Sequence, residues 1–143
     1  MKQVILDTGV ITTLLGSKIP EEIIALKVQL LEKEIQGHVT KQILLEVAKN
    51  LSLIYKRDEI DSLIWSFLNT YEISIIEPDI ATYLRAGRLQ YREKKTFSAC
   101  DSLIITIASN RKDKFTIYTT DGKMVETSKR IKNSARFKIY RFS

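Results

Sequence analysis

Short apolar segments alternate with longer stretches of helical periodicity along this chain. Residues 4–6 form a continuous apolar run, which predicts a strand that is covered on both faces. Further extended segments are expected at 38–39, 72–76, 114–120 and 136–142. The last of these alternates strictly between apolar and polar positions, as an edge strand with one solvated face does.

Between these segments, apolar residues recur at helical spacing. The pattern predicts helices at 10–15, 20–37, 40–54, 57–68, 80–93 and 98–108, and a basic helix or turn at 123–132. Ile54 is expected to close the apolar stripe of the third helix and Trp65 to pack in the fourth, whereas His38 is expected at the surface. Strands that alternate with helices predict a three-layer α/β/α sandwich with a central, largely parallel sheet.

The composition fits one globular domain spanning residues 1–143. No apolar run is long enough to span a membrane, and no signal peptide is recognised. A single cysteine, Cys100, cannot form an internal disulfide, which favours a reducing cytoplasm. The net charge of +6 indicates either a polyanionic partner or a solvated surface rich in lysine.

Two carboxylates follow predicted strands directly. Asp7 ends the first apolar run, and Asp121 ends the segment 114–120. Ligands of open α/β sheets bind outside the carboxyl ends of the strands, so both side chains are placed where such folds do chemistry. Each has a structural alternative, because Asp is a favoured N-cap and Asp-Gly is a turn signal.

Two further carboxylates lie at helix positions. Asp101 stands three residues after Ser98, as in a capping box, but it also shares the core-facing stripe of its helix with Ile104 and Ile105. The stripe favours a functional Asp101 over a purely capping one. Glu46 lies at the edge of the apolar face of its helix, where it either joins a site or forms a salt bridge.

Carboxylates that meet at one edge of a sheet repel one another unless a cation neutralises them. Oxygen ligands without His or Cys suit Mg²⁺ or Mn²⁺. Such a metal activates water for attack on a phosphodiester, and a basic protein suits that substrate. Thr8, Ser102 and Thr119 are candidate accessory residues. The fifth helix has a basic side that either binds RNA or is only a solvated surface. Its residues are Arg85, Arg88, Arg92, Lys94 and Lys95.

Four segments together resemble the ordered acidic motifs of PIN-domain ribonucleases, in particular the VapC toxins of toxin–antitoxin pairs. They are residues 4–8, 44–47, 99–105 and 119–121, and they span nearly the whole chain. The sequence departs from the family pattern at Gly9 and Met124. The resemblance implies a Mg²⁺-dependent endoribonuclease, with Mn²⁺ as a substitute, that acts on RNA as a homodimer and is blocked by an antitoxin. Its metal-binding acids would be Asp7, Glu46, Asp101 and Asp121, with Thr119 as an accessory residue.

Other classes that combine Mg²⁺ with carboxylates fit less well. A phosphatase of the haloacid dehalogenase type would place a second Asp two residues after Asp7, where this chain has Gly9. A receiver domain would need an acidic pair near its first strand. A non-catalytic RNA-binding or protein-interaction module on the same fold is the alternative from a different functional class.

Overall fold

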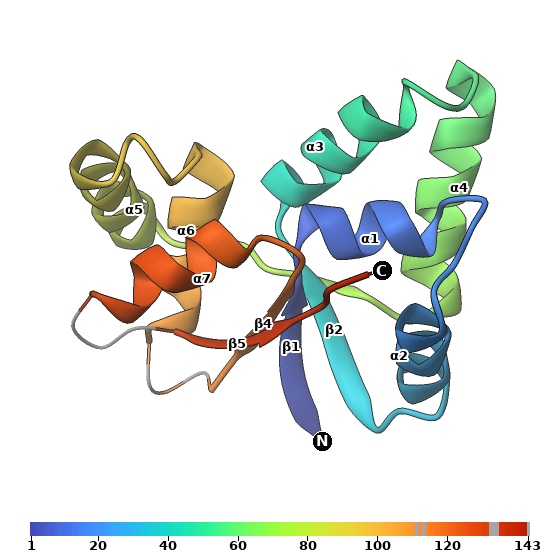
Figure 1. The fold of residues 1–143 in the computed structure, drawn as a ribbon, viewed down its shortest axis with the longest axis horizontal. Helices are drawn as coiled ribbons and strands as arrows, with labels where there is room; N and C mark the ends of the chain where they lie inside the picture. Colours follow the sequence, from blue (N-terminus) through green and yellow to red (C-terminus); the bar gives the residue numbers. More distant parts are fainter. Residues whose placement is uncertain (111, 113, 132–134, 143) are drawn as a thin grey trace.

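The computed structural model describes residues 1–110, 112, 114–131 and 135–142. Five strands among these residues form one sheet in the order β3-β2-β1-β4-β5, and every neighbouring pair is parallel (Figure 1). The strands are β1 (Lys2–Leu6), β2 (Ile35–Val39), β3 (Ser74–Ile75), β4 (Thr116–Thr119) and β5 (Arg136–Ile139). The predicted parallel sheet is confirmed, as is the edge position of the last strand.

Helices cover both sides of this sheet, which gives the predicted three-layer sandwich. Helices α5, α6 and α7 gather on one side of the molecule and α1 to α4 on the other (Figure 1). The helices are α1 (Thr8–Leu14), α2 (Glu21–Leu31), α3 (Lys41–Leu51), α4 (Arg57–Thr70), α5 (Ile80–Arg92), α6 (Ala99–Ala108) and α7 (Gly122–Lys129). None of the described helices is long and apolar enough to cross a membrane.

The central strand β1 explains why the chain folds around its first residues. Val4, Ile5 and Leu6 have no exposed surface, because β2 and β4 flank the strand and helices cover it. An apolar run without polar alternation is typical of a strand buried on both faces. Parallel pairing then brings the carboxyl ends of β1 and β4 to the same edge of the sheet.

The second predicted helix is too long in the sequence analysis. It ends at Leu31, and residues 35–37, expected to be helical, belong to strand β2. Lys33 adopts a positive φ of 58°, which a helix does not accommodate. Ile35 fits a helical stripe and an alternating strand equally well, and its pairing with Lys2 of β1 decides for the strand.

Three side chains differ from the sequence-based expectation. Ile54 lies beyond the end of α3 and is exposed, and Trp65 is 66% exposed on α4 instead of packing. His38 is half-buried rather than at the surface. Its Nε2 lies 2.6 Å from Oε1 of Gln3, and its ring contacts the ring of Phe115 edge-on. Burial lowers the pKa of His38.

Candidate acidic active site

Asp7 lies where β1 passes into α1, and it is 6% exposed. It is the N-cap of α1, as one sequence-based alternative proposed, because its Oδ1 accepts a hydrogen bond from the Thr8 backbone N–H at 2.8 Å. Its other oxygen, Oδ2, accepts a hydrogen bond from the Thr119 hydroxyl at 2.6 Å. Both carboxylate oxygens are therefore held in place by the protein.

Thr119 connects the first and last acidic motifs. It is fully buried at the end of β4, and its partner Asp7 lies 112 residues away in the sequence. The same hydroxyl that donates to Asp7 accepts a hydrogen bond from the Asp121 backbone N–H at 3.0 Å. Asp121 in turn caps α7 by accepting from the Met124 N–H at 3.1 Å. Thr119 thereby fixes the position of Asp121 relative to Asp7.

Glu46 reaches the same edge of the sheet from the middle of α3. Its Oε2 accepts a hydrogen bond from the Thr8 hydroxyl at 3.1 Å, so the salt bridge considered for it is not formed among the described residues. Thr8 lies in the first turn of α1, directly after Asp7, and is almost fully buried. The two predicted accessory threonines thus each hold one carboxylate.

Asp101 lies in the first turn of α6 and completes a capping box with Ser98. Its Oδ2 accepts from the Ser98 N–H at 3.0 Å, and its own N–H donates to the Ser98 hydroxyl at 3.1 Å. Burial raises the pKa of Asp101 to about 6, and the charges of Asp7 and Asp121 add to this rise against the hydrogen bonds from Ser98. The carboxylate is therefore both a cap and a member of a repulsive cluster.

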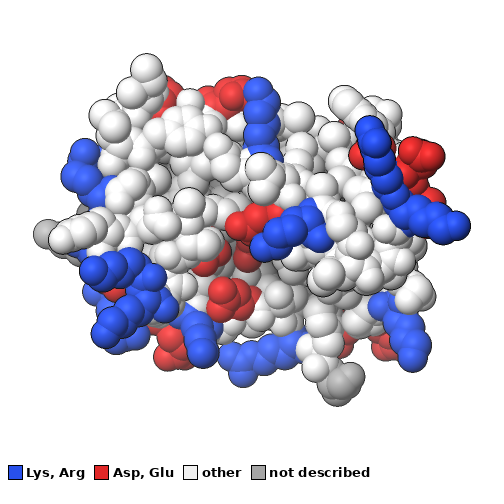
Figure 2. All heavy atoms as spheres, turned by 90° about the horizontal axis from the view of Figure 1, so that it is seen from above, with Lys and Arg blue, Asp and Glu red and all other residues white. Residues whose placement is uncertain are grey.

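The four carboxylates influence one another electrostatically. Burial raises the pKa of Asp7, its hydrogen bonds from Thr119 and Thr8 lower it, and the charges of Asp121 and Glu46 raise it further. We call Asp7, Glu46, Asp101 and Asp121 the acid cluster. Seen from the carboxyl ends of the strands, acidic side chains gather near the middle of the face, with Lys and Arg side chains around them (Figure 2).

The acid cluster has the donor chemistry of a hard divalent cation, because it offers carboxylate and hydroxyl oxygens. In the part of the chain that the structure describes, no three Asp, Glu, His or Cys side chains converge as a ready metal cage. Each carboxylate instead accepts at least one internal hydrogen bond. A carboxylate oxygen retains a second lone pair in such a bond. Burial and the charges of neighbouring carboxylates raise the pKa of Asp7 and of Asp101, and this fits a metal site because a bound cation would relieve the repulsion.

Two groups of predicted residues are not brought into the acid cluster by any contact. Ser102 is buried, but its hydroxyl finds no hydrogen-bond partner among the described residues. On the basic side of α5, Arg85 lies in reach of Asp79, and Lys94 lies over the Tyr91 ring at 5.4 Å. Of that basic set, Lys95 is the residue that lines a cavity next to Asp121.

The sequence analysis gave Cys100 no place in the site, and it predicted a basic segment at 123–132 without proposing Lys123 or Arg130 as site residues. Burial raises the pKa of the Cys100 thiol far above its usual range, and the charges of Glu46, Asp7 and Asp101 add to the effect. The thiol is thus a neutral, buried neighbour of the acid cluster. Lys123 and Arg130 stand seven residues apart on α7, a spacing that places them on one helix face and could have revealed them.

No protein-family model and no curated protein matches this sequence. Solved structures do match it over nearly its full length. VapBC2 from Rickettsia felis, bound to a DNA fragment from its promoter, contains a chain with a TM-score of 0.71 and 19% identity, covering 97% of this chain and 99% of that one. FitAcB from Neisseria gonorrhoeae has a TM-score of 0.61 and 18% identity, covering 94% and 95% of the two chains. FitAB bound to an IR36 DNA fragment has a TM-score of 0.62 and 19% identity, covering 95% and 94%.

These similarities concern the fold. At 18–19% identity they cover 94–97% of this chain. The chain therefore has the PIN-like fold that its sequence predicted.

Proposed function

We propose that this protein is a metal-dependent endoribonuclease that uses Mg²⁺, or Mn²⁺ in its place, to hydrolyse phosphodiester bonds of RNA. The observation that carries the proposal is the acid cluster, which brings together four carboxylates from four parts of the chain. Burial raises the pKa of Asp7 and of Asp101, and the charges of neighbouring carboxylates of the cluster raise both further. A partly buried cluster of like charges costs stability unless a cation neutralises it, so such a cluster indicates a functional site.

In this proposal Asp7, Glu46, Asp101 and Asp121 hold the cation. A bound Mg²⁺ would supply a water of lowered pKa and would neutralise charge on the phosphoryl oxygens. The threonines position the ligands, because Thr119 orients Asp7 and Asp121 while Thr8 orients Glu46. Asp101 is held by the first turn of α6, so its free oxygen lies at a rigid element rather than on a loop.

A specific observation also favours the non-catalytic alternative. Asp7, Asp101 and Asp121 each cap a helix, so each has a structural reason to be present without any catalysis. The alternative is an RNA-binding or protein-interaction module on the same fold. It predicts that removing the charge of one carboxylate changes stability slightly and leaves binding intact.

An RNA-cleavage assay separates the nuclease from the non-catalytic module. It compares wild type with Asp101→Asn in the presence of Mg²⁺, Mn²⁺ or EDTA. Asn is nearly isosteric and keeps an oxygen for the Ser98 N–H. Asp79→Asn is a matched control, because Asp79 caps α5 through Thr82 and lies outside the acid cluster. We expect metal-dependent cleavage that Asp101→Asn loses and Asp79→Asn keeps. Cleavage that survives both EDTA and Asp101→Asn would falsify the mechanism, and RNA binding without cleavage by wild type would favour the module.

We further propose that the nuclease is a homodimeric toxin held inactive by an antitoxin. The support is the fold, which it shares with the chains of the VapBC2 and FitAB complexes. The first step of the test is to look for a small gene directly upstream and to co-express its product with this protein. A stable complex that suppresses cleavage would support this proposal, and an active protein that never associates with that product would contradict it. Light scattering of the purified protein gives the oligomeric state.

A further inference from the structure

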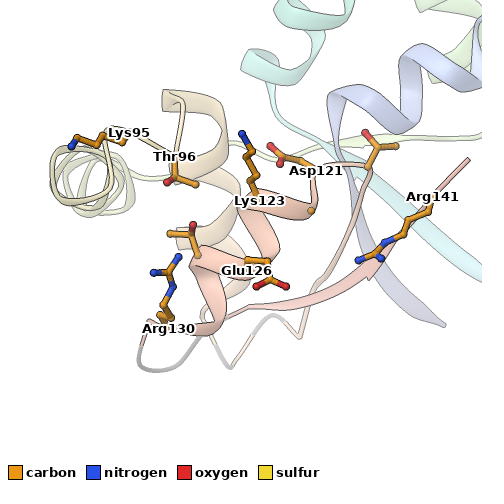
Figure 3. A pocket seen from close by; sticks show the side chains of 10 residues that line it. Lys95, Thr96, Asp121, Lys123, Glu126, Arg130 and Arg141 are labelled. Carbon is orange, nitrogen blue, oxygen red and sulfur yellow. The ribbon is translucent and has the colours of Figure 1, made fainter.

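A cavity of about 770 Å³ lies directly beside the acid cluster. Three parts of the chain line it: the connection between α5 and α6, the segment from the end of β4 through α7, and Arg141 near the C-terminus (Figure 3). Asp121 belongs to both the acid cluster and this cavity. A molecule bound in the cavity would therefore extend to within contact of the acid cluster.

Cations dominate the lining of the cavity. Four basic side chains line it against two carboxylates, Asp121 and Glu126; the basic ones are Lys95, Lys123, Arg130 and Arg141. The ion pairs among the described residues are Lys33–Glu72 and Lys41–Glu77, so none of the four is neutralised by a salt bridge there. Exposed cations without partners remain available to an anionic ligand.

Helix α7 presents its share of the lining from one face. Lys123, Thr127 and Arg130 follow the i, i+4, i+7 spacing, which places their side chains along the same side of a helix. The connection between α5 and α6 contributes Lys95 and Thr96. The cations thus form a row rather than a single point, as a ligand with several successive negative charges requires.

The lining also indicates which part of a nucleic acid would bind. No aromatic side chain is among the described residues that line the cavity, so they offer no base-stacking platform. Lys and Arg contacts to phosphates position a strand without reading its sequence. The volume is of the size that holds a drug-sized ligand, which admits a few nucleotides of single strand but not a duplex.

We propose that this cavity, the basic groove, binds the sugar–phosphate backbone of single-stranded RNA next to the acid cluster. Lys123 and Arg130 provide the central phosphate contacts, with Lys95 and Arg141 at its sides. The proposal rests on the proposed nuclease for the identity of the ligand, and it names how that substrate is held. An acidic protein segment is the competing occupant, and the position of Asp121 at the edge of the groove favours a substrate.

The test measures RNA binding rather than cleavage. Fluorescence anisotropy of a labelled single-stranded 20-mer is recorded over a salt series, with Asp101→Asn as the background so that the RNA stays intact. The groove variant is Lys123→Gln with Arg130→Gln. Its matched control is Lys129→Gln with Arg57→Gln, which removes the same charges from the same protein at exposed positions that do not line the groove and that are not candidate RNA contacts.

We expect the groove variant to bind roughly tenfold more weakly, and to lower the slope of log K against log salt by about 0.7 for each phosphate that is no longer neutralised. The weakening should be equal for poly-U and poly-A, because backbone contacts carry no sequence information. Equal weakening by the groove variant and the control would overturn the proposal, as would weakening confined to one sequence. Cleavage by wild type is assayed in parallel, so that a bound but uncut RNA contradicts the nuclease and leaves the groove standing. If wild type cuts the RNA but the groove variant binds it as tightly as the Asp101→Asn parent, the nuclease proposal stands and the groove proposal is contradicted.

Discussion

The acid cluster and the basic groove lie side by side but differ in burial and in how their charges are held. The acid cluster collects side chains from four separate parts of the chain, with Asp7 and its partner Thr119 buried. The basic groove takes Lys123 and Arg130 from a single helix face, and both are exposed. Hydrogen bonds hold every carboxylate, whereas the cations have no ion-pair partner among the described residues.

This difference corresponds to the ligand that each region suits. Like charges in a site of low solvent exposure repel one another strongly. Hydrogen bonds from the protein can hold such carboxylates in place, and a compact cation can neutralise them. Exposed cations repel weakly through water and act by their number along an extended polyanion. Changes in the acid cluster should therefore alter chemistry and stability, and changes in the basic groove should alter affinity and its salt dependence.

The largest effect is expected from Asp7→Asn. Loss of one ligand charge should reduce cleavage by about 10²–10³-fold, the range found when one group that stabilises developing charge is removed. The same change removes repulsion within the cluster, so the melting temperature in EDTA should stay equal or rise. Steady-state cleavage assays measure the loss of activity, and thermal unfolding of the same preparations measures the melting temperature. A variant that loses activity because its melting temperature collapses would argue for a structural role instead.

Gly9→Ala tests the place where the two regions meet. A Cβ at Gly9 would overlap the hydroxyl of Thr120, which itself lines the basic groove. We expect a destabilisation of about 1–3 kcal/mol, typical of overpacking. Thr120→Ala removes the overlapping oxygen, so Gly9→Ala with Thr120→Ala should recover most of the loss. Denaturant unfolding of the two single variants and the double variant gives the coupling, and additive effects would show that the two residues do not interact.

The pH dependence of stability should reveal the burial of Asp101 beside the charges of Asp7 and Asp121. Its pKa rises from 3.8 to about 6 on folding. Between about pH 4 and pH 6 the native state therefore binds more protons than the unfolded chain, and stability falls as pH rises through this window. The contribution is on the order of 1 kcal/mol after solvent screening. Thermal unfolding in EDTA should show a smaller decline for Asp101→Asn than for wild type.

A divalent cation provides the complementary measurement at pH 7. Mg²⁺ that binds only the native state should raise the melting temperature of wild type, and Asp101→Asn should respond less. Equal pH profiles for the two proteins, together with no response to Mg²⁺, would remove the electrostatic basis of the metal site.

The smallest expected effect is a gain from Glu126→Gln. Glu126 is a carboxylate within the basic groove, so its removal should strengthen RNA binding by roughly two- to threefold and steepen the salt dependence. Glu59→Gln on α4 is an equal change of charge away from the groove and serves as the control. Anisotropy at two salt concentrations is sufficient, and an identical gain from both variants would indicate a net-charge effect without a groove.

Much of the fold is encoded locally and could be predicted from the sequence. Apolar periodicity predicted the order of strands and helices, and the predicted helix starts at residues 40 and 98 coincide with the N-caps Thr40 and Ser98. The end of α2 could not be predicted in this way. Residues 35–37 satisfy a helical and a strand pattern, and pairing with β1 selects the strand.

The sequence by itself also placed Asp7 and Asp121 after strands and Asp101 in the first turn of a helix. Their proximity was decided by tertiary structure alone. The register between β1 and β4, in which Leu6 pairs with Tyr118, sets Asp7 beside Thr119 across 112 residues of chain. Hydrophobic patterns report how each segment meets the core, but they carry no information on which segments become neighbours. The basic groove depends on the same assembly, because its cations come from segments that only the folded sheet brings together.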